Sequence, residues 1–219
     1  MHGIISSRYL FPTVREIARF TPVLVPDLAG FSPYDRPDAV PDLASQADAL
    51  ALEIRAWSGL GATVVGHSIG AEVVVELARR HPAIVGRAVL VGPTGDPRAS
   101  TVLRMWGRWM ATAVFEPLSF NLLTVAELVT LGPRRMVNLV RRSLGDPMEP
   151  KLGDVTCPAL LVRGTRDRVA SQPWLDHMAR RIPDAVAVTL PDAAHTLVYT
   201  DPSRLADLVL RFARGADVR

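Results

Sequence analysis

The feature that most constrains this chain is the stretch 62–80, ATVVGHSIGAEVVVELARR. Residues 62–65 are apolar and partly β-branched, which favours a buried strand, and residues 71–80 place apolar side chains at helical spacing. Residues 66–70 between them read G-H-S-I-G. A strand, G-x-S-x-G and a helix in this order predict a nucleophile elbow, a sharp turn that holds Ser68 clear of the sheet. The pattern also arises by chance, and the alternative is a plain strand-to-helix loop in which the serine caps the helix.

The elbow leads to two further expectations. Glycine is needed on both sides of the turn, because a Cβ at Gly66 or Gly70 would collide with the neighbouring strand or helix. The start of the helix would also place the Ile69 N–H beside the Ser68 oxygen, where an oxyanion forms during acyl transfer.

The rest of the chain alternates between strand and helix patterns. Strands are expected at 22–26, 88–91, 159–162 and 187–190, and helices within 6–20 and at 39–57, 173–182 and 202–214. This alternation predicts an α/β fold with a mostly parallel sheet flanked by helices. Three helical patterns without a strand interrupt it, at 100–113, 117–131 and 133–144. We therefore expect a core made of residues 1–95 and 154–219, and a helical cap, or lid, inserted at 96–153.

Ser68 needs a base and a group that orients this base, because a serine hydroxyl is a poor nucleophile at neutral pH. Functional residues of a parallel sheet gather at the carboxyl ends of its strands. Asp167 follows the expected strand 159–162, and His195 follows the strand 187–190. The order Ser, Asp, His therefore predicts a catalytic triad of these three residues.

Other residues compete weakly for these roles. Asp96 and Asp192 are the fallback acids, because each lies in a loop after a strand. His67 adjoins the serine, but adjacent side chains at an elbow point apart, so we expect it to be structural. None of the five histidines has metal-site spacing with other ligands, so we expect neither a metal nor a cofactor.

Composition narrows the class of protein. The 219 residues, 48% of them hydrophobic, suffice for one domain with an insertion. No apolar run approaches the ~18 residues of a membrane span and no signal-peptide pattern is visible, so we expect a cytoplasmic protein. The single cysteine, Cys157, excludes an internal disulfide. The formal net charge of +3 is spread at helical spacings instead of one patch, so we expect no nucleic-acid partner.

Taken together, these motifs resemble the α/β-hydrolase superfamily in its cap-bearing branch, over essentially the whole length. The matching features are His2-Gly3, the PDLAGF turn at 26–31, GHSIG, the loop 164–167 and Ala194-His195. The sequence is similar in style to bacterial serine esterases, lipase-like enzymes and carbon–carbon bond hydrolases. The resemblance implies that Ile4 lends a second backbone N–H to the oxyanion hole, beside Ile69.

The same resemblance separates branches of the superfamily. Dehalogenases and epoxide hydrolases carry aspartate at the elbow centre, whereas position 68 is serine. Carbon–carbon hydrolases tend to have asparagine before the serine and tryptophan after the histidine. Here these positions are His67 and Thr196, which favours an esterase and leaves carbon–carbon cleavage as the alternative.

One departure from the family concerns the start of the chain. In the family, His-Gly ends a central strand that two further strands usually precede, but this chain begins at Met1. We therefore expect a gap in the sheet between the strands 23–25 and 62–65, with unpaired backbone groups on both sides. Coding sequence upstream or a strand from a second copy in a homodimer would fill it. Without either, we expect poor stability, or an inactive family member that serves as a binding protein.

The expected cap is rich in apolar side chains. These are Met105, Trp106, Trp109, Met110, Phe115, Phe120 and Leu122. They favour a hydrophobic acyl or alcohol group in a small-molecule substrate, although the arginines of the cap could instead meet a carboxylate. The sequence thus predicts a serine hydrolase that cleaves a carboxylic ester through an acyl-enzyme.

Overall fold

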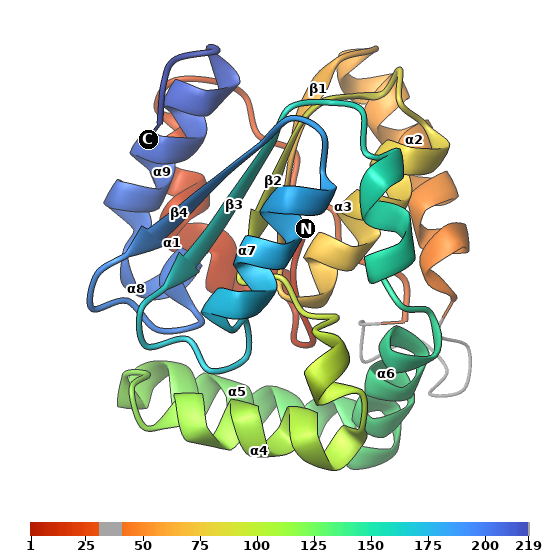
Figure 1. The fold of residues 1–219 in the computed structure, drawn as a ribbon. Coiled ribbons are helices and arrows are strands. Elements are labelled where there is room, and N and C mark those ends of the chain that lie inside the picture. Colours follow the sequence, from red (N-terminus) through yellow and green to blue (C-terminus); the bar gives the residue numbers. More distant parts are fainter. Residues whose placement is uncertain (31–40, 219) are drawn as a thin grey trace.

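The computed structural model describes residues 1–30 and 41–218, and its centre is a parallel sheet (Figure 1). The strands lie in the order β1-β2-β3-β4. They span Ala62–His67, Val85–Val91, Ala159–Gly164 and Ala185–Leu190. Leu90 of β2 pairs with Gly66 of β1 and with Leu161 of β3, so the carboxyl ends of these three strands lie at the same edge of the sheet. The predicted α/β fold is confirmed.

Helices cover both faces of this sheet. On one face lie α2, α3 and α7, which span Leu43–Ser58, Ile69–Arg80 and Gln172–Arg181. On the other lie α1, α8 and α9, which span Phe11–Ala18, Leu197–Thr200 and Pro202–Ala213. Successive strand residues alternate between the two cores: Leu161 packs with the first set, whereas Leu160 and Val162 pack with the second. The central strands β2 and β3 are largely buried on both faces, which explains why they read as continuous apolar runs.

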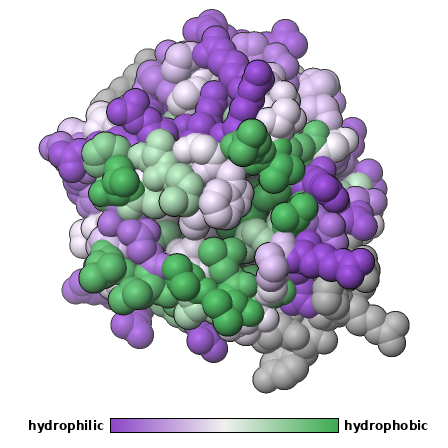
Figure 2. All heavy atoms as spheres, turned by 90° about the horizontal axis from the view of Figure 1, so that it is seen from below, coloured by the Kyte–Doolittle hydropathy of each residue, from purple (hydrophilic) through white to green (hydrophobic). Residues whose placement is uncertain are grey.

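Three consecutive helices lie beyond the carboxyl ends of the strands, at the bottom of Figure 1. They are α4, α5 and α6, which span Val102–Ala113, Leu118–Leu131 and Pro133–Gly145. Short 3₁₀ turns occur at Ser7–Leu10, Pro97–Ala99 and Glu149–Asp154. Apolar side chains of α4, α5 and their connection gather on the outer surface (Figure 2); exposed ones are Leu103, Trp106, Met110, Val114, Phe115, Leu118, Leu122, Val125 and Val129. Within the described ranges, no helix is both long and apolar enough to cross a membrane.

The strand expected at 22–26 is wrong. This segment forms no strand, and its apolar residues are only half-buried. Val25 packs its side chain against the core on the α1–α9 face, so its apolar character reflects packing instead of strand pairing. The expected helix at 39–57 begins later, at Leu43 after the capping residue Asp42. Its first residues and the end of the loop after Gly30 lie outside the described residues.

Among the described residues no strand pairs with the outer edge of β1, so the elbow strand lacks a strand neighbour on that side, as expected. Because the segment 22–26 forms no strand either, β1 ends the described sheet instead of bordering a gap inside it. Part of its outer edge is paired by the first residue of the chain. The Met1 nitrogen donates to the Val65 carbonyl at 2.6 Å, and the Met1 carbonyl accepts from the His67 N–H at 3.1 Å. The Met1 backbone thus fills two ladder positions beside the elbow.

Candidate active site

The turn between β1 and α3 has the strained geometry expected of an elbow. Ser68 has φ +57° and ψ −124°, a conformation that L-residues rarely adopt. A Cβ on Gly66 would lie 2.3 Å from the Gly70 carbonyl oxygen, and one on Gly70 would lie 2.5 Å from the His2 carbonyl oxygen. Both glycines are therefore required by close backbone approach. The sheet and helix hold Ser68 in this conformation from both sides.

The structure brings Asp167 and His195 together from separate loops. Asp167 follows β3 and His195 follows β4, and both are buried. The Asp167 Oδ2 atom accepts a hydrogen bond from His195 Nδ1 at 2.9 Å. Its Oδ1 atom accepts from the Val169 and Ala170 N–H groups at 2.8 and 2.9 Å. The carboxylate is thus fixed in orientation, and it leaves Nε2 as the nitrogen of His195 that can accept a proton.

Two side chains that the sequence did not single out hold these loops. The buried Arg163 guanidinium donates to the carbonyls of Asp167 and Ala170 at 2.7 and 2.8 Å. Glu116, between α4 and α5, accepts from the Thr196 N–H at 2.8 Å and also from its hydroxyl. Neither residue belongs to a recognisable motif, so no local signal could have marked it.

The pKa of His195 is raised above its ordinary value by two carboxylates. Burial lowers this pKa, but the charge of Asp167, its hydrogen bond and the charge of Glu116 outweigh the burial. Because the protonated form of the imidazole is stabilised in this way, His195 is suited to act as a general base.

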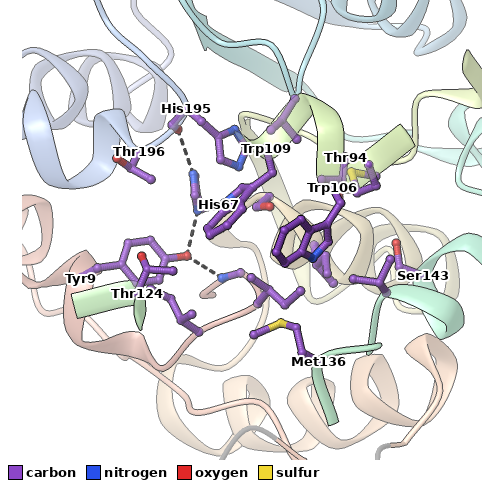
Figure 3. Close-up of a pocket in the computed structure, with 18 of the residues that line it drawn as sticks. Tyr9, His67, Thr94, Trp106, Trp109, Thr124, Met136, Ser143, His195 and Thr196 are labelled. Atoms are coloured by element: carbon purple, nitrogen blue, oxygen red, sulfur yellow. Dashed lines mark hydrogen bonds between the residues drawn. The ribbon is translucent and has the colours of Figure 1, made fainter. Parts of the chain in front are cut away.

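Ser68, His195, Ile4 and Ile69 all line one cavity, whose empty space including the mouth is about 840 Å³ (Figure 3). In the described part of the chain, the Ser68 hydroxyl makes no hydrogen bond, to His195 or elsewhere. The N–H groups of Ile4 and Ile69 likewise have no partner among the residues described, so they are available to an oxyanion. The remaining lining is mostly apolar and includes Met105, Trp106, Trp109, Phe120, Leu128, Met136 and Val140.

A hydrogen-bond chain joins the first residues to the loop of His195 (Figure 3). The His195 carbonyl can only accept, so His67 donates to it from Nε2 at 3.0 Å. His67 Nδ1 therefore accepts from the Tyr9 hydroxyl at 2.8 Å, and Tyr9 in turn accepts from the Gly3 N–H at 2.5 Å. Burial and the neighbouring His195 hold the pKa of His67 well below its usual range, which keeps the ring neutral. His67 is thus a structural link, and no motif in the sequence marked its partner Tyr9.

The two fallback acids pair with other residues. Asp96 accepts from Arg108 at 2.5 Å and from Ser171 at 2.9 Å, which ties α4 to the loop after β3. Asp192 is exposed and pairs with Arg166 at 2.7 Å. Among the residues described, no group of three or more His, Cys, Asp or Glu side chains could hold a metal ion.

Comparison with known proteins shows the family of this chain. Residues 1–208 match the model of the alpha/beta hydrolase family, and the chain belongs to this family. It is 25% identical over 244 residues to a 2-(acetamidomethylene)succinate hydrolase of Mesorhizobium japonicum, across 96% of this chain and 85% of that protein. It is 27% identical over 208 residues to a pimeloyl-[acyl-carrier protein] methyl ester esterase of Aromatoleum aromaticum, across 80% of this chain and 81% of that protein.

Among solved structures, a hydrolase from Oleispira antarctica superposes with a TM-score of 0.82. The match covers 97% of this chain and 89% of that chain at 16% identity, which shows a shared fold. The family match and the curated relatives support a hydrolytic enzyme.

Proposed function

We propose that this protein is a serine hydrolase that cleaves carboxylic esters of hydrophobic small molecules. The observation that carries the proposal is that His195, hydrogen-bonded to Asp167, lines the same cavity as the strained elbow serine, Ser68. Both members of the pair are buried, and every oxygen of the acid is engaged. Such complete positioning is what a general base needs and what a solvated loop acid lacks.

In the proposed acylation step, Ser68 Oγ attacks the ester carbonyl carbon while His195 Nε2 takes the hydroxyl proton. Asp167 stabilises the imidazolium that forms. The carbonyl oxygen becomes an oxyanion, which accepts hydrogen bonds from the Ile4 and Ile69 N–H groups. One such donor contributes roughly 10²–10³ in rate. Collapse of the tetrahedral intermediate breaks the ester C–O bond, and His195 returns the proton to the departing alcohol.

Deacylation repeats these steps with water. His195 removes a proton from water, the hydroxide attacks the acyl-enzyme carbonyl, and the Ser68 oxygen leaves with the proton from His195. The overall reaction converts the ester and one water into an alcohol and a carboxylic acid, regenerates Ser68 and needs no redox step.

The lining of the cavity favours an ester over the carbon–carbon alternative. In the described part of the chain, no arginine or lysine lines the cavity, so a substrate carboxylate would find no cationic partner there. Trp106, Trp109 and Met136 instead offer apolar contact to an acyl or alcohol chain. Because several lining side chains come from α4–α6, we propose that residues 96–153 act as the lid that sets specificity, over a core of residues 1–95 and 154–219.

A fluorophosphonate probe tests the proposal, because it reacts only with an activated serine. We expect labelling of the native protein, complete loss in Ser68→Ala, and no change in Ser100→Ala, which removes an exposed serine outside the cavity. A folded native protein that stays unlabelled would falsify the enzyme and favour an inactive binding protein. p-Nitrophenyl esters of increasing acyl length, assayed beside a dienoate ketone, then separate ester from carbon–carbon cleavage.

A further inference from the structure

A buried carboxyl lies behind the wall of the cavity and takes no part in the proposed chemistry. Glu72 belongs to α3, one helical turn after Ser68, and is only 2% exposed. Its Oε1 atom accepts from the Thr94 hydroxyl at 2.5 Å and from the Ser143 hydroxyl at 2.8 Å. Its Oε2 atom is buried without a hydrogen-bond partner among the described residues.

The two hydroxyl groups come from different parts of the fold and meet at the cavity. Thr94 follows β2, and Ser143 lies on α6. Both line the cavity, whereas Glu72 stands behind them. Figure 3 shows Thr94 and Ser143 on the same side of the cavity, opposite Tyr9.

The hydrogen-bond directions decide what this wall can recognise. A hydroxyl has one proton to donate and two lone pairs that accept. Thr94 and Ser143 both direct their proton to Glu72 Oε1, which accepts whether or not the carboxyl is ionised. Neither hydroxyl oxygen accepts a hydrogen bond among the described residues, so their lone pairs remain for a ligand. The wall therefore presents acceptors only, with a carboxyl behind them.

We propose that Thr94 and Ser143, oriented by Glu72, form a subsite that selects substrates with a hydrogen-bond donor on an otherwise apolar chain. The donor is a hydroxyl, an amide N–H or an ammonium group. A substrate carboxylate is rejected, because it meets lone pairs and a buried acid. This inference rests on the proposed function, of which it specifies the substrate class.

The surroundings make this selection effective. Met136 and Val140 of α6 and Trp106 of α4 line the same cavity and are apolar. A polar group buried among them without a partner costs free energy, so only a group matched to the two hydroxyls enters without loss. A site built to hydrogen-bond a substrate group discriminates more strongly than an apolar pocket does.

Equilibrium binding to Ser68→Ala tests the subsite without any turnover. The probes are methyl esters of matched length whose far end is a methyl, a hydroxyl or a carboxylate group. Tryptophan fluorescence reports binding, because Trp106 and Trp109 line the cavity. At the length that reaches the subsite, we expect the hydroxyl ester to bind roughly tenfold or more tightly than the carboxylate ester.

Added substitutions identify the residues responsible. Ser143→Ala and Thr94→Val should each weaken binding of the hydroxyl ester about three- to tenfold and leave the methyl ester within about twofold. Thr94→Ser keeps the hydroxyl and should restore the preference. Thr130→Ala, which removes an exposed hydroxyl of α5, is the matched control and should change nothing. Above about pH 7, where Glu72 is ionised, Glu72→Gln removes the charge and should improve binding of the carboxylate ester.

Two results would overturn the subsite. One is equal binding of the hydroxyl and carboxylate esters at every length. The other is an unchanged preference in folded Ser143→Ala and Thr94→Val, which would reduce the cluster to a structural tie between α3 and α6. Neither result depends on Ser68 chemistry, because binding is measured with Ser68→Ala. The fluorophosphonate probe tests the proposed hydrolase separately, so failure of the subsite is distinguishable from failure of the hydrolase.

Discussion

The structure predicts the effect of Asp167→Asn on activity in most detail. Asp167 Oδ1 accepts from two backbone N–H groups, those of Val169 and Ala170, and Oδ2 accepts from His195 Nδ1. Asparagine has one side-chain oxygen, and the two N–H groups require it to take the Oδ1 position. The amide nitrogen then faces His195 Nδ1. Because both would be donors, the imidazole must carry its proton on Nε2 instead.

This tautomer cannot act as the base, because the proposed proton acceptor for Ser68 is Nε2. We expect kcat to fall by about 10³–10⁴ with KM little changed, as for loss of the orienting acid in other triads. The substitution also removes the main contributor that raises the pKa of His195. In the native enzyme, activity should be lost as the pH falls through this raised pKa; in Asp167→Asn, the residual activity should persist to lower pH.

The assay is p-nitrophenyl butyrate hydrolysis from acidic to alkaline pH, with the tautomer of His195 read from imidazole ¹⁵N shifts. Asp192→Asn is the matched control, because this exposed acid pairs only with Arg166 among the described residues. Its activity should stay within about twofold of the native value. A folded Asp167→Asn protein with more than about a tenth of native kcat would refute the tautomer argument. Loss of activity in Asp192→Asn would instead identify Asp192 as the acid that orients His195.

Two further predictions concern buried groups around the cavity. Tyr9→Phe leaves the Gly3 N–H and His67 Nδ1 without their partner, so we expect the free energy of urea unfolding to fall by about 1–3 kcal/mol and kcat to fall roughly tenfold. The control Tyr199→Phe, which removes a hydroxyl from the surface, should change neither quantity. A Tyr9→Phe protein with unchanged stability and kcat would contradict the proposed link. Burial raises the pKa of Glu72 to about 7, so the folded state binds a proton more tightly than the unfolded state. The stability that Glu72 contributes by binding this proton is fully present below the unfolded-state pKa. As the pH rises to about 7, this contribution is lost, and the free energy of unfolding falls by about 3 kcal/mol. Urea unfolding of native and Glu72→Gln proteins at several pH values should show this loss as their difference, and a difference independent of pH would contradict it.

The sequence marked those features that depend on short stretches of chain. The elbow follows from steric limits on five residues, and the close approaches of Gly66 and Gly70 are the reason for its glycines. The apolar strands β1 to β4 were predicted because a sheet buried on both faces requires continuous apolar runs. Asp167 and His195 were selected by their place after strands, and the structure brings them into hydrogen-bond contact.

The errors arose where pairing depends on distant residues. The apolar run at 23–25 has the composition of a strand, but a strand also needs a neighbour, and side-chain packing satisfies this segment instead. With no strand at 22–26, β1 ends the described sheet, and the strand neighbour whose absence the sequence predicted is indeed missing there.

What the sequence alone determined is the order of elements, the elbow and the candidate triad, because each is encoded in local spacing or in its place along the chain. Only the tertiary structure decided which polar groups meet. Tyr9 reaches His67, Glu116 reaches Thr196, and Glu72 joins Thr94 to Ser143 across long stretches of sequence. Burial makes these contacts obligatory, since a polar group removed from water needs a partner, and folding alone selects which partner is within reach.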